Sequence, residues 1–343
     1  MTGPADSPTD ARSAEEQAAA FRDTWAAIHA EVGKVIVGQG PVVDGVLTAL
    51  LAGGHVLLEG VPGLGKTLLV RTLGSAVDLA FSRIQFTPDM MPADIQGTQV
   101  LVELEGGGHE LRFQEGPLIA NLVLADEINR ATPKTQSALL EAMQERQITV
   151  GRRTITLDEP YCVMATQNPI EQEGTYPLPE AQLDRFLFKL IVGYPAEGEI
   201  HAILDRTTGL DEAAVQPVRH GDDIIALRRV VRGVPVPEAV RTHAVRLVLA
   251  TQPGSDYAPA IVNDNVMLGS SPRGAQGLLL AGKVRALVDG RFSVSTDDVR
   301  AAAKDVLRHR VLVNFQGQSE GITADGILDG VLAHVRPAGH DDA

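Results

Sequence analysis

The stretch that decides the fold reads Gly60-Val61-Pro62-Gly63-Leu64-Gly65-Lys66-Thr67. Its spacing, G-x-x-x-x-G-K-[ST], is that of a loop whose backbone N–H groups surround phosphate oxygens. In such a loop, Lys66 supplies positive charge to the outer phosphates, and the hydroxyl of Thr67 is available to Mg²⁺. The sequence therefore predicts a site for ATP and Mg²⁺ at this loop.

The residues on either side of the loop supply the strand and the helix that it needs. Residues 55–59 form a short apolar run, typical of a buried strand, and apolar residues recur at helical spacing over 68–73. A helix that begins at the loop directs the positive end of its dipole toward bound phosphates. The context of the motif thus supports the nucleotide site.

Length and charge limit the kinds of protein to consider. The chain has 343 residues, enough for two domains, and a net charge of −14 from 30 basic and 44 acidic side chains. This acidic balance argues against nonspecific binding to nucleic acid or to an anionic membrane. The single cysteine, Cys162, lies in an apolar run and is interpreted as a core residue of a protein in a reducing compartment.

The ends and the hydropathy of the chain give the expected location. No apolar run approaches the ~20 residues that cross a bilayer. The N-terminus lacks the basic and apolar regions of a signal peptide. We therefore expect a cytoplasmic protein without a transmembrane segment, in which residues 1–20 form a disordered tail.

Short strand-like runs alternate with helical patterns through the first part of the chain. Five such runs occupy residues 55–59, 82–86, 121–125, 161–166 and 187–192. Most are continuously apolar, as expected of strands that are covered on both faces. The pattern predicts an α/β fold of the P-loop NTPase type: three αβα layers around a five-stranded parallel sheet.

Two segments interrupt this alternation, and a change of character follows it. Residues 100–113 and 146–157 each read as a β-hairpin, with turns at Gly106-Gly107-Gly108 and Gly151-Arg152. Helical signals dominate after Pro195. We expect a disordered tail over 1–20, an ATPase domain over 21–195, and a smaller all-α lid domain over 196–343.

A pair of carboxylates follows the third strand-like run. Asp126 and Glu127 come directly after the apolar residues 122–125, about 60 residues beyond the phosphate loop. A strand that ends in carboxylates by itself is usually only a strand that meets solvent. Downstream of a phosphate loop, however, we expect Asp126 to hold Mg²⁺ or its water shell, and Glu127 to polarise the attacking water.

Three further polar residues complete the candidate site, although each has an ordinary structural explanation. Asn168 ends the next strand, where it could reach the γ-phosphate or simply form an Asn-Pro turn. Arg185 follows Asp184, as in a surface ion pair. Arg273 lies in the first turn of a helix, where a cation opposes the helix dipole, and this indicates a compensating anion.

With these sites in order, the chain resembles the MoxR family of AAA+ ATPases, of the helix-2-insert clade, over roughly residues 30 to 312. The resemblance rests on blocks of sequence that are more specific than the loop itself. These blocks are Val37-Gly38-Gln39, Arg83-Ile84-Gln85-Phe86-Thr87-Pro88-Asp89, Asp94-Ile95-Gln96-Gly97, Phe113-Gln114-Glu115-Gly116-Pro117, Asp126-Glu127-Ile128-Asn129-Arg130-Ala131, Leu140-Glu141-Ala142-Met143-Gln144-Glu145, Ala165-Thr166-Gln167-Asn168-Pro169 and Leu307-Arg308-His309-Arg310.

The resemblance implies roles for several residues. Gly38 and Gln39 would lie near the adenine of ATP. Asn168 looks like the sensor 1 residue of the family. Arg185 looks like the arginine finger, which reaches the ATP of a neighbouring subunit, and Arg273 looks like sensor 2, acting on the nucleotide of either its own or the neighbouring subunit.

The resemblance also implies partners. The family forms rings, usually hexamers, and its hairpins face the central pore. Its members are chaperone-like remodellers of client proteins, often paired with a protein that carries a von Willebrand factor A domain, and some assist metal or cofactor insertion. We expect the same of this chain.

Two other functions remain open at this point. A chelatase-type subunit or a nucleic-acid motor of the same clade would suit Arg146, Arg152 and Arg153 on a hairpin, although these side chains are as readily solvated surface. The net charge makes nucleic acid an unlikely partner. A nucleotide-dependent scaffold with little turnover would not need Glu127, Asn168 and Arg185 together.

Overall fold

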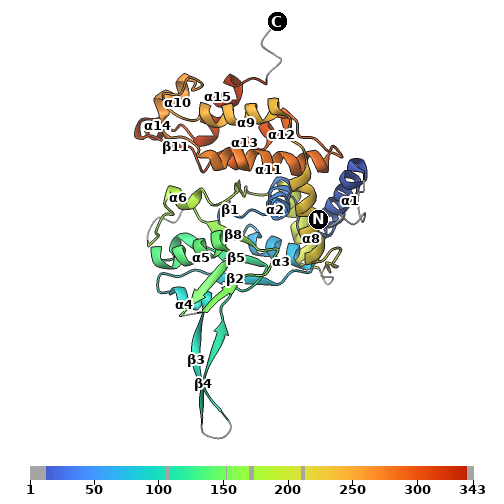
Figure 1. The fold of residues 1–343 in the computed structure, drawn as a ribbon, viewed down its shortest axis with the longest axis vertical. Helices are drawn as coiled ribbons and strands as arrows, with labels where there is room; N and C mark the ends of the chain where they lie inside the picture. Colours follow the sequence, from blue (N-terminus) through green and yellow to red (C-terminus); the bar gives the residue numbers. More distant parts are fainter. Residues whose placement is uncertain (1–12, 105–107, 152, 170–173, 210–212, 338–343) are drawn as a thin grey trace, which may run out of the picture.

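The computed structural model describes residues 13–104, 108–151, 153–169, 174–209 and 213–337. Its centre is a five-stranded parallel sheet with the order β2-β5-β8-β1-β9 (Figure 1). The strands are β1 (Val56–Glu59), β2 (Phe81–Gln85), β5 (Leu122–Asp126), β8 (Cys162–Gln167) and β9 (Phe188–Ile191). The predicted sheet is confirmed, with each strand within about one residue of its predicted run.

Helices cover both faces of the sheet and bury alternate residues of the strands. Leu58 packs in one apolar core, which α2 (Gly40–Ala52) and α3 (Lys66–Ala76) share. Leu57 points the other way, into a second core that α5 (Pro133–Glu145) closes. The three-layer αβα arrangement is therefore confirmed, and it explains why the strands read as continuously apolar.

Both predicted hairpins form outside this sheet. The first pairs β3 (Gly97–Glu103) with β4 (His109–Glu115) and projects from the body of the molecule (Figure 1). The second pairs β6 (Gln147–Val150) with β7 (Arg153–Thr156). Their predicted turn residues Gly106, Gly107 and Arg152 lie outside the described residues.

The predicted N-terminal tail is too long. Helix α1 (Ala14–Val35) includes residues 14–20, which were expected to be disordered. The helix begins there because Ser13 and Glu16 form a reciprocal capping box, in which each side chain binds the backbone N–H of the other. Burial of Ala18 and Phe21 then fixes the first turns against the core.

The C-terminal part of the chain is a helical lid, as predicted, with one short pair of strands inside it. Helix α8 packs against α2 of the large domain as well as against α11, so the boundary at 195/196 stays a prediction. The elements are α7 (Glu197–Thr207), α8 (Gly221–Gly233), α9 (Glu238–Ala250), α10 (Ala260–Asn265), β10 (Val266–Leu268), α11 (Pro272–Val288), α12 (Thr296–Ala301), α13 (Ala303–Leu307), β11 (Leu312–Val313), α14 (Phe315–Ser319) and α15 (Ala324–His334).

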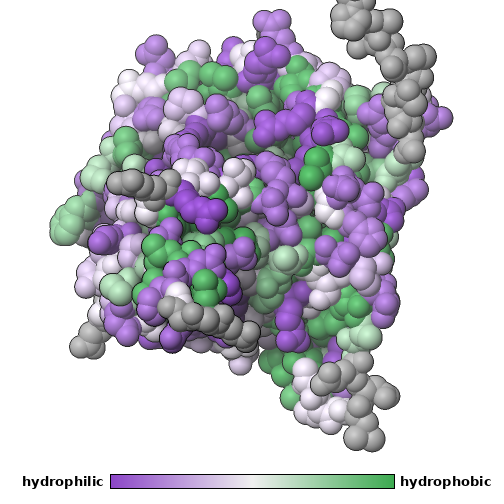
Figure 2. Space-filling view, turned by 60° about the horizontal axis from the view of Figure 1, so that its bottom comes forward, coloured by the Kyte–Doolittle hydropathy of each residue, from purple (hydrophilic) through white to green (hydrophobic). Residues whose placement is uncertain are grey.

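Neither the surface that Figure 2 draws nor the described helices have the long apolar stretches of a membrane-spanning segment. Figure 2 shows hydrophilic side chains interspersed with hydrophobic ones over the face that it draws. Among the described helices, none combines the length and the apolar character that crossing a bilayer requires. The expected location in the cell stays a prediction.

Candidate active site

The phosphate loop lies where the sequence predicted it, between β1 and α3. Gly63 and Gly65 have φ values of +84° and +76°, a left-handed conformation that side chains other than glycine's adopt only with strain. Position 60 requires glycine for another reason, because a Cβ there would lie 2.7 Å from the carbonyl oxygen of Val192. The motif glycines thus set both the curl of the loop and its close approach to the end of β9.

The ammonium group of Lys66 lies inside the loop. Its Nζ donates hydrogen bonds to the carbonyl oxygens of Gly60, at 2.6 Å, and of Val61, at 3.1 Å. Burial lowers the pKa of Lys66, while the nearby charges of Asp126 and Glu127 act to raise it. The cation therefore stands at the first turn of α3 with two carboxylates close enough to influence it.

The segment ahead of the first strand reaches the loop as well. Gln39 has a φ of +53° and precedes α2, and its Nε2 donates to the carbonyl oxygen of Leu64 at 2.9 Å. The neighbouring Gly38 also has a positive φ, of +66°. The structure thus places Gly38 and Gln39 beside the phosphate loop.

The loop, the two carboxylates and Asn168 converge on one pocket of about 340 Å³, which we call the phosphate pocket. It forms at the carboxyl ends of neighbouring parallel strands, where ligands of open α/β sheets bind. Its lining residues are Pro62, Gly63, Gly65, Lys66, Thr67, Leu68, Arg83, Gln85, Asp126, Glu127, Thr166 and Asn168.

Local hydrogen bonds orient the two carboxylates. Asp126 ends β5, and its Oδ1 accepts a 2.6 Å hydrogen bond from the hydroxyl of Thr166 on the adjacent β8. The same hydroxyl accepts a hydrogen bond from the backbone N–H of Glu127 at 2.8 Å. Glu127 has a φ of +57°, so the chain turns sharply after Asp126 and presents the second carboxylate to the pocket.

The residues present fit a nucleotide-bound Mg²⁺ ion. In nucleotide sites this ion keeps several waters and takes one or two protein oxygens together with phosphate oxygens. The hydroxyl of Thr67 and the carboxylate of Asp126, both in the phosphate pocket, are oxygen donors of this kind. They would hold the ion between the loop and β5, where it would neutralise phosphate charge.

Two residues in the phosphate pocket had no role predicted from the sequence. Arg83 donates to Oδ2 of Asp126, from Nη2 at 2.7 Å and from Nε at 3.2 Å. Gln85 donates from Nε2 to Glu127 at 2.8 Å. Both residues belong to the block at residues 83–89 that resembles the MoxR family, but only the pairing of β2 with β5 reveals what they contact.

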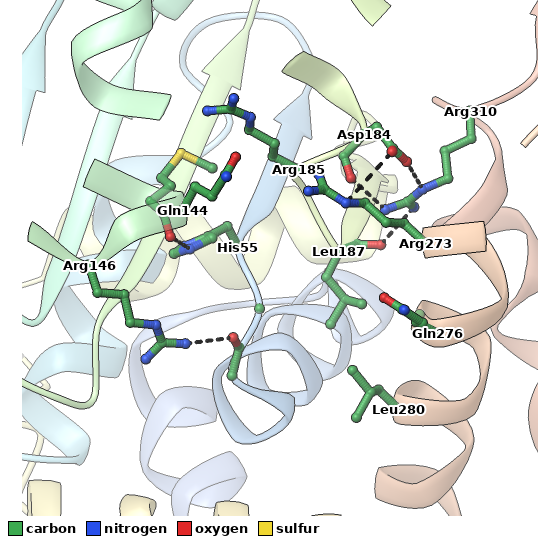
Figure 3. A pocket seen from close by; sticks show the side chains of 14 residues that line it. His55, Gln144, Arg146, Asp184, Arg185, Leu187, Arg273, Gln276, Leu280 and Arg310 are labelled. Atoms are coloured by element: carbon green, nitrogen blue, oxygen red, sulfur yellow. Dashed lines mark hydrogen bonds and ion pairs between the residues drawn. The ribbon is translucent and has the colours of Figure 1, made fainter. Parts of the chain in front are cut away.

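Arg185 and Arg273 lie in a second pocket, of about 250 Å³, which we call the arginine pocket (Figure 3). Its lining residues are Gly53, Gly54, His55, Met143, Gln144, Arg146, Asp184, Arg185, Leu187, Arg273, Gln276, Gly277, Leu280 and Arg310. Among these described residues, none also lines the phosphate pocket. The six predicted catalytic residues therefore fall into two groups.

The two pockets lie toward opposite ends of the same strand. His55, just before β1, lines the arginine pocket, whereas Gly60, just after β1, begins the phosphate loop. Five residue steps of an extended strand separate these two residues by roughly 16 Å. Within one chain, then, the pocket that holds the two arginines lies at the amino ends of β1 and β9, whereas the phosphate loop lies at the carboxyl end of β1.

The lid is fastened to the segment that carries Arg185. The guanidinium of Arg310 is buried and binds Oδ1 of Asp184 at 2.8 Å and the carbonyl oxygen of Phe186 at 2.6 Å. Ser271, the N-cap of α11, donates to the same Asp184 carboxylate. These contacts hold the lid, and with it Arg273, next to Arg185.

The three arginines that were considered for substrate contact have different positions. Arg146 caps the end of α5, donates to Glu159 and to the carbonyl oxygen of Gly53, and lines the arginine pocket. These contacts give Arg146 a structural role at the end of α5, away from the exposed surface of the hairpin. Arg153 is exposed on β7, and Arg152 lies outside the described residues.

Comparisons with known proteins agree with this arrangement. Residues 55–188 match the sequence model of the ATPase family associated with various cellular activities (AAA), and residues 258–331 match that of the AAA lid domain. The crystal structure of a putative ATPase from Cytophaga hutchinsonii, at 2.00 Å resolution, superposes with a TM-score of 0.88 at 40% identity, and the match covers 94% of this chain and 97% of that one.

Relatives of similar length define the family more closely. "Chaperone MoxR1" of Mycobacterium tuberculosis is 45% identical over 305 residues, which cover 89% of this chain and 80% of the relative. "Uncharacterized protein YeaC" of Bacillus subtilis is 42% identical over 308 residues, covering 89% and 92%. "Protein MoxR" of Methylorubrum extorquens is 31% identical over 309 residues, covering 85% and 89%. This chain is an ATPase that belongs to the MoxR family of AAA+ proteins.

Proposed function

We propose that the phosphate pocket binds ATP with Mg²⁺ and that hydrolysis takes place there. Lys66 and the metal ion, held by Thr67 and Asp126, offset charge on the β- and γ-phosphates. Glu127 orients the attacking water, and Asn168 contacts the γ-phosphate or that water. Gly38 and Gln39 border the adenine. Support comes from the gathering of these polar groups around one loop.

The function depends on a neighbouring subunit, because Arg185 and Arg273 act on the nucleotide of that neighbour. The observation that carries this proposal is the separation of the two pockets at opposite ends of β1. A cation at the opposite end of the strands contributes little at its own phosphate loop, because the interaction falls with distance and is screened by solvent. An arginine supplied from a partner is typically worth 10³–10⁵ in rate, or roughly 4–7 kcal/mol of barrier.

Shared sites of this kind require a head-to-tail interface, which closes into a ring if the rotation allows. We propose a homo-oligomeric ring, a hexamer by analogy with the family, that remodels or matures client proteins in the cytoplasm. The relative named "Chaperone MoxR1" supports this role. The projecting hairpin β3–β4 offers exposed Leu101 and Leu111 to a client. A von Willebrand factor A domain protein is the expected partner, and metal or cofactor insertion or complex assembly is the expected outcome.

Dilution tests the shared site. The rate of ATP hydrolysis per chain should rise steeply with protein concentration as subunits associate, and it should fall toward zero for the separated monomer. Sedimentation at each concentration would report the oligomeric state. A monomer that hydrolyses ATP as fast per chain as the assembled protein would contradict the proposal.

A further inference from the structure

Arg83 makes the most specific contact in the phosphate pocket that the proposed function leaves without a role. It lies on β2, two residues before the strand ends, and its guanidinium binds one carboxylate oxygen, Oδ2 of Asp126, through both Nη2 and Nε. Nη2 also donates to Oε1 of Gln85, at 2.5 Å. The side chain of Arg83 remains 46% exposed and lines the pocket, so it is held by polar contacts rather than by packing.

The carboxylate of Asp126 is partly occupied while this contact lasts. Arg83 donates two hydrogen bonds to Oδ2, and Thr166 donates one to Oδ1. The hydroxyl of Thr166 is itself fixed by the backbone N–H of Glu127. Of the two partners, only Arg83 carries a charge, and the guanidinium keeps it at every accessible pH.

A metal ion and a guanidinium compete for the same charge. Mg²⁺ that approaches Asp126 gains from the full negative charge of the carboxylate, and an arginine that neutralises this charge weakens the attraction. The two cations also repel each other at short distance. An ion that takes Asp126 as a ligand or water-shell partner must therefore displace or weaken the contact with Arg83.

We propose that Arg83 is a positioning residue that competes with Mg²⁺ for Asp126 and so sets the Mg²⁺ concentration at which nucleotide is loaded. The inference rests on the proposed function, because it assumes that the phosphate pocket takes nucleotide with Mg²⁺. Before loading, Arg83 neutralises part of the charge of Asp126 through this ion pair. After loading, Mg²⁺ attracts the carboxylate of Asp126 more strongly, so the contact between Arg83 and Asp126 is weaker.

The first test measures binding rather than turnover. Fluorescent mant-ADP is titrated into the full chain at a series of free Mg²⁺ concentrations, for the wild type, Arg83→Gln and the control Arg22→Gln, which changes an exposed ion pair with Asp23 on α1. Arg83→Gln should lower the midpoint for Mg²⁺ by about two- to fivefold, as expected for a partly exposed ion pair. Arg22→Gln should not change it. An unchanged or higher midpoint for Arg83→Gln would overturn the inference.

The second test needs no nucleotide and keeps the two proposals separable. Thermal unfolding in EDTA is compared for the wild type, Arg83→Gln, Asp126→Asn and the double variant. Arg83→Gln should lower the melting temperature when Asp126 is present, and it should have little effect in the Asp126→Asn background. Equal effects in both backgrounds, in proteins that bind mant-ADP, would overturn the inference and leave the proposed function standing. A failure of the wild type to bind mant-ADP would overturn the proposed function and the inference with it.

Discussion

The phosphate pocket and the arginine pocket differ in how much of a reaction each can perform. The phosphate pocket combines a cation, two carboxylates and a glycine loop from the carboxyl ends of adjacent strands. The arginine pocket brings together Arg185, Arg273 and Arg310, of which the last two pair with Asp184 (Figure 3). None of the described residues that line it belongs to the phosphate loop. In the function that we propose, one chain binds the substrate while its neighbour supplies the charge that speeds the reaction.

The largest expected effect is on ATP binding, the step that precedes hydrolysis. Lys66→Ala removes the cation that lies within the phosphate loop, so nucleotide binding should be lost. Calorimetric titration with ATP and Mg²⁺ measures it. The control Lys304→Ala, which alters an exposed lid pair with Asp329, should bind as the wild type does. If Lys66→Ala still bound ATP, the phosphate pocket could not be assigned as the nucleotide site, and the comparison of the two pockets would fail.

The next effect falls on the arginine pocket. Arg185→Ala should bind ATP with unchanged affinity, because its side chain lies away from the phosphate pocket and donates to the carbonyl oxygen of Leu140. Its hydrolysis rate should fall by about 10³–10⁵, the usual contribution of an arginine supplied by a partner. Steady-state turnover at saturating ATP measures the loss. Hydrolysis at the normal rate would show that the assigned role is wrong.

A third effect concerns stability at the floor of the arginine pocket. Nδ1 of His55 accepts a hydrogen bond from the N–H of Val163, and its Nε2 lies 3.1 Å from the carbonyl oxygen of Met143. Burial lowers the pKa of His55 from 6.5 to about 4. The folded chain thus holds the neutral ring, while the unfolded chain takes up a proton near pH 6.5. The neutral ring of His55 therefore stabilises the folded chain fully above pH 6.5, and this stabilisation is lost as the pH falls through 4.

The size of that loss can be measured. With ~1.4 kcal/mol for each pH unit between the two pKa values, the free energy of unfolding should fall by up to about 3 kcal/mol. Urea unfolding at a series of pH values measures it. His55→Gln should lack this part of the pH dependence, and the exposed-residue variant His201→Gln should keep it. The same pH dependence in all three proteins would contradict the assignment.

The smallest expected effect compares two arginines of the lid. Arg273 is half exposed, and its ion pair with Asp184 is long, at 3.9 Å, so Arg273→Ala should leave the lid folded. Turnover should fall by about tenfold, equivalent to ~1.4 kcal/mol of barrier. Arg310→Ala, by contrast, should lower the melting temperature, because it leaves Asp184 and several backbone carbonyls without their buried donor. Equal melting temperatures for the two variants would contradict this division.

The sequence predicted what depends on neighbours along the chain. The phosphate loop, the strand before it and the carboxylates after β5 are local patterns, and the sheet was confirmed strand by strand. The contact between Arg83 and Asp126 could not be read in this way, because it depends on β2 lying beside β5 in the sheet order. The predicted tail extended to residue 20, whereas the capping box of Ser13 and Glu16 starts helix α1 at residue 14.

The grouping of Arg185 with Arg273 also lay beyond the sequence. These residues are far apart along the chain and line one pocket, where Arg310 and Ser271 of the lid bind the carboxylate of Asp184. Nothing in the local pattern around Arg310 distinguishes a buried guanidinium from a surface one. Sequence reasoning therefore found the six candidate catalytic residues, while only the fold showed that they line two separate pockets.

Mixing two inactive variants tests the shared site most directly. Arg185→Ala keeps an intact phosphate pocket, and Glu127→Gln keeps an intact arginine pocket. In an equal mixture, about a quarter of head-to-tail interfaces should combine the two intact halves. We predict that the mixture regains up to about that fraction of wild-type ATP hydrolysis, although each variant alone is nearly inactive. A mixture that hydrolyses ATP no faster than the sum of the two separate variants, while forming mixed rings, would contradict a site built from two chains.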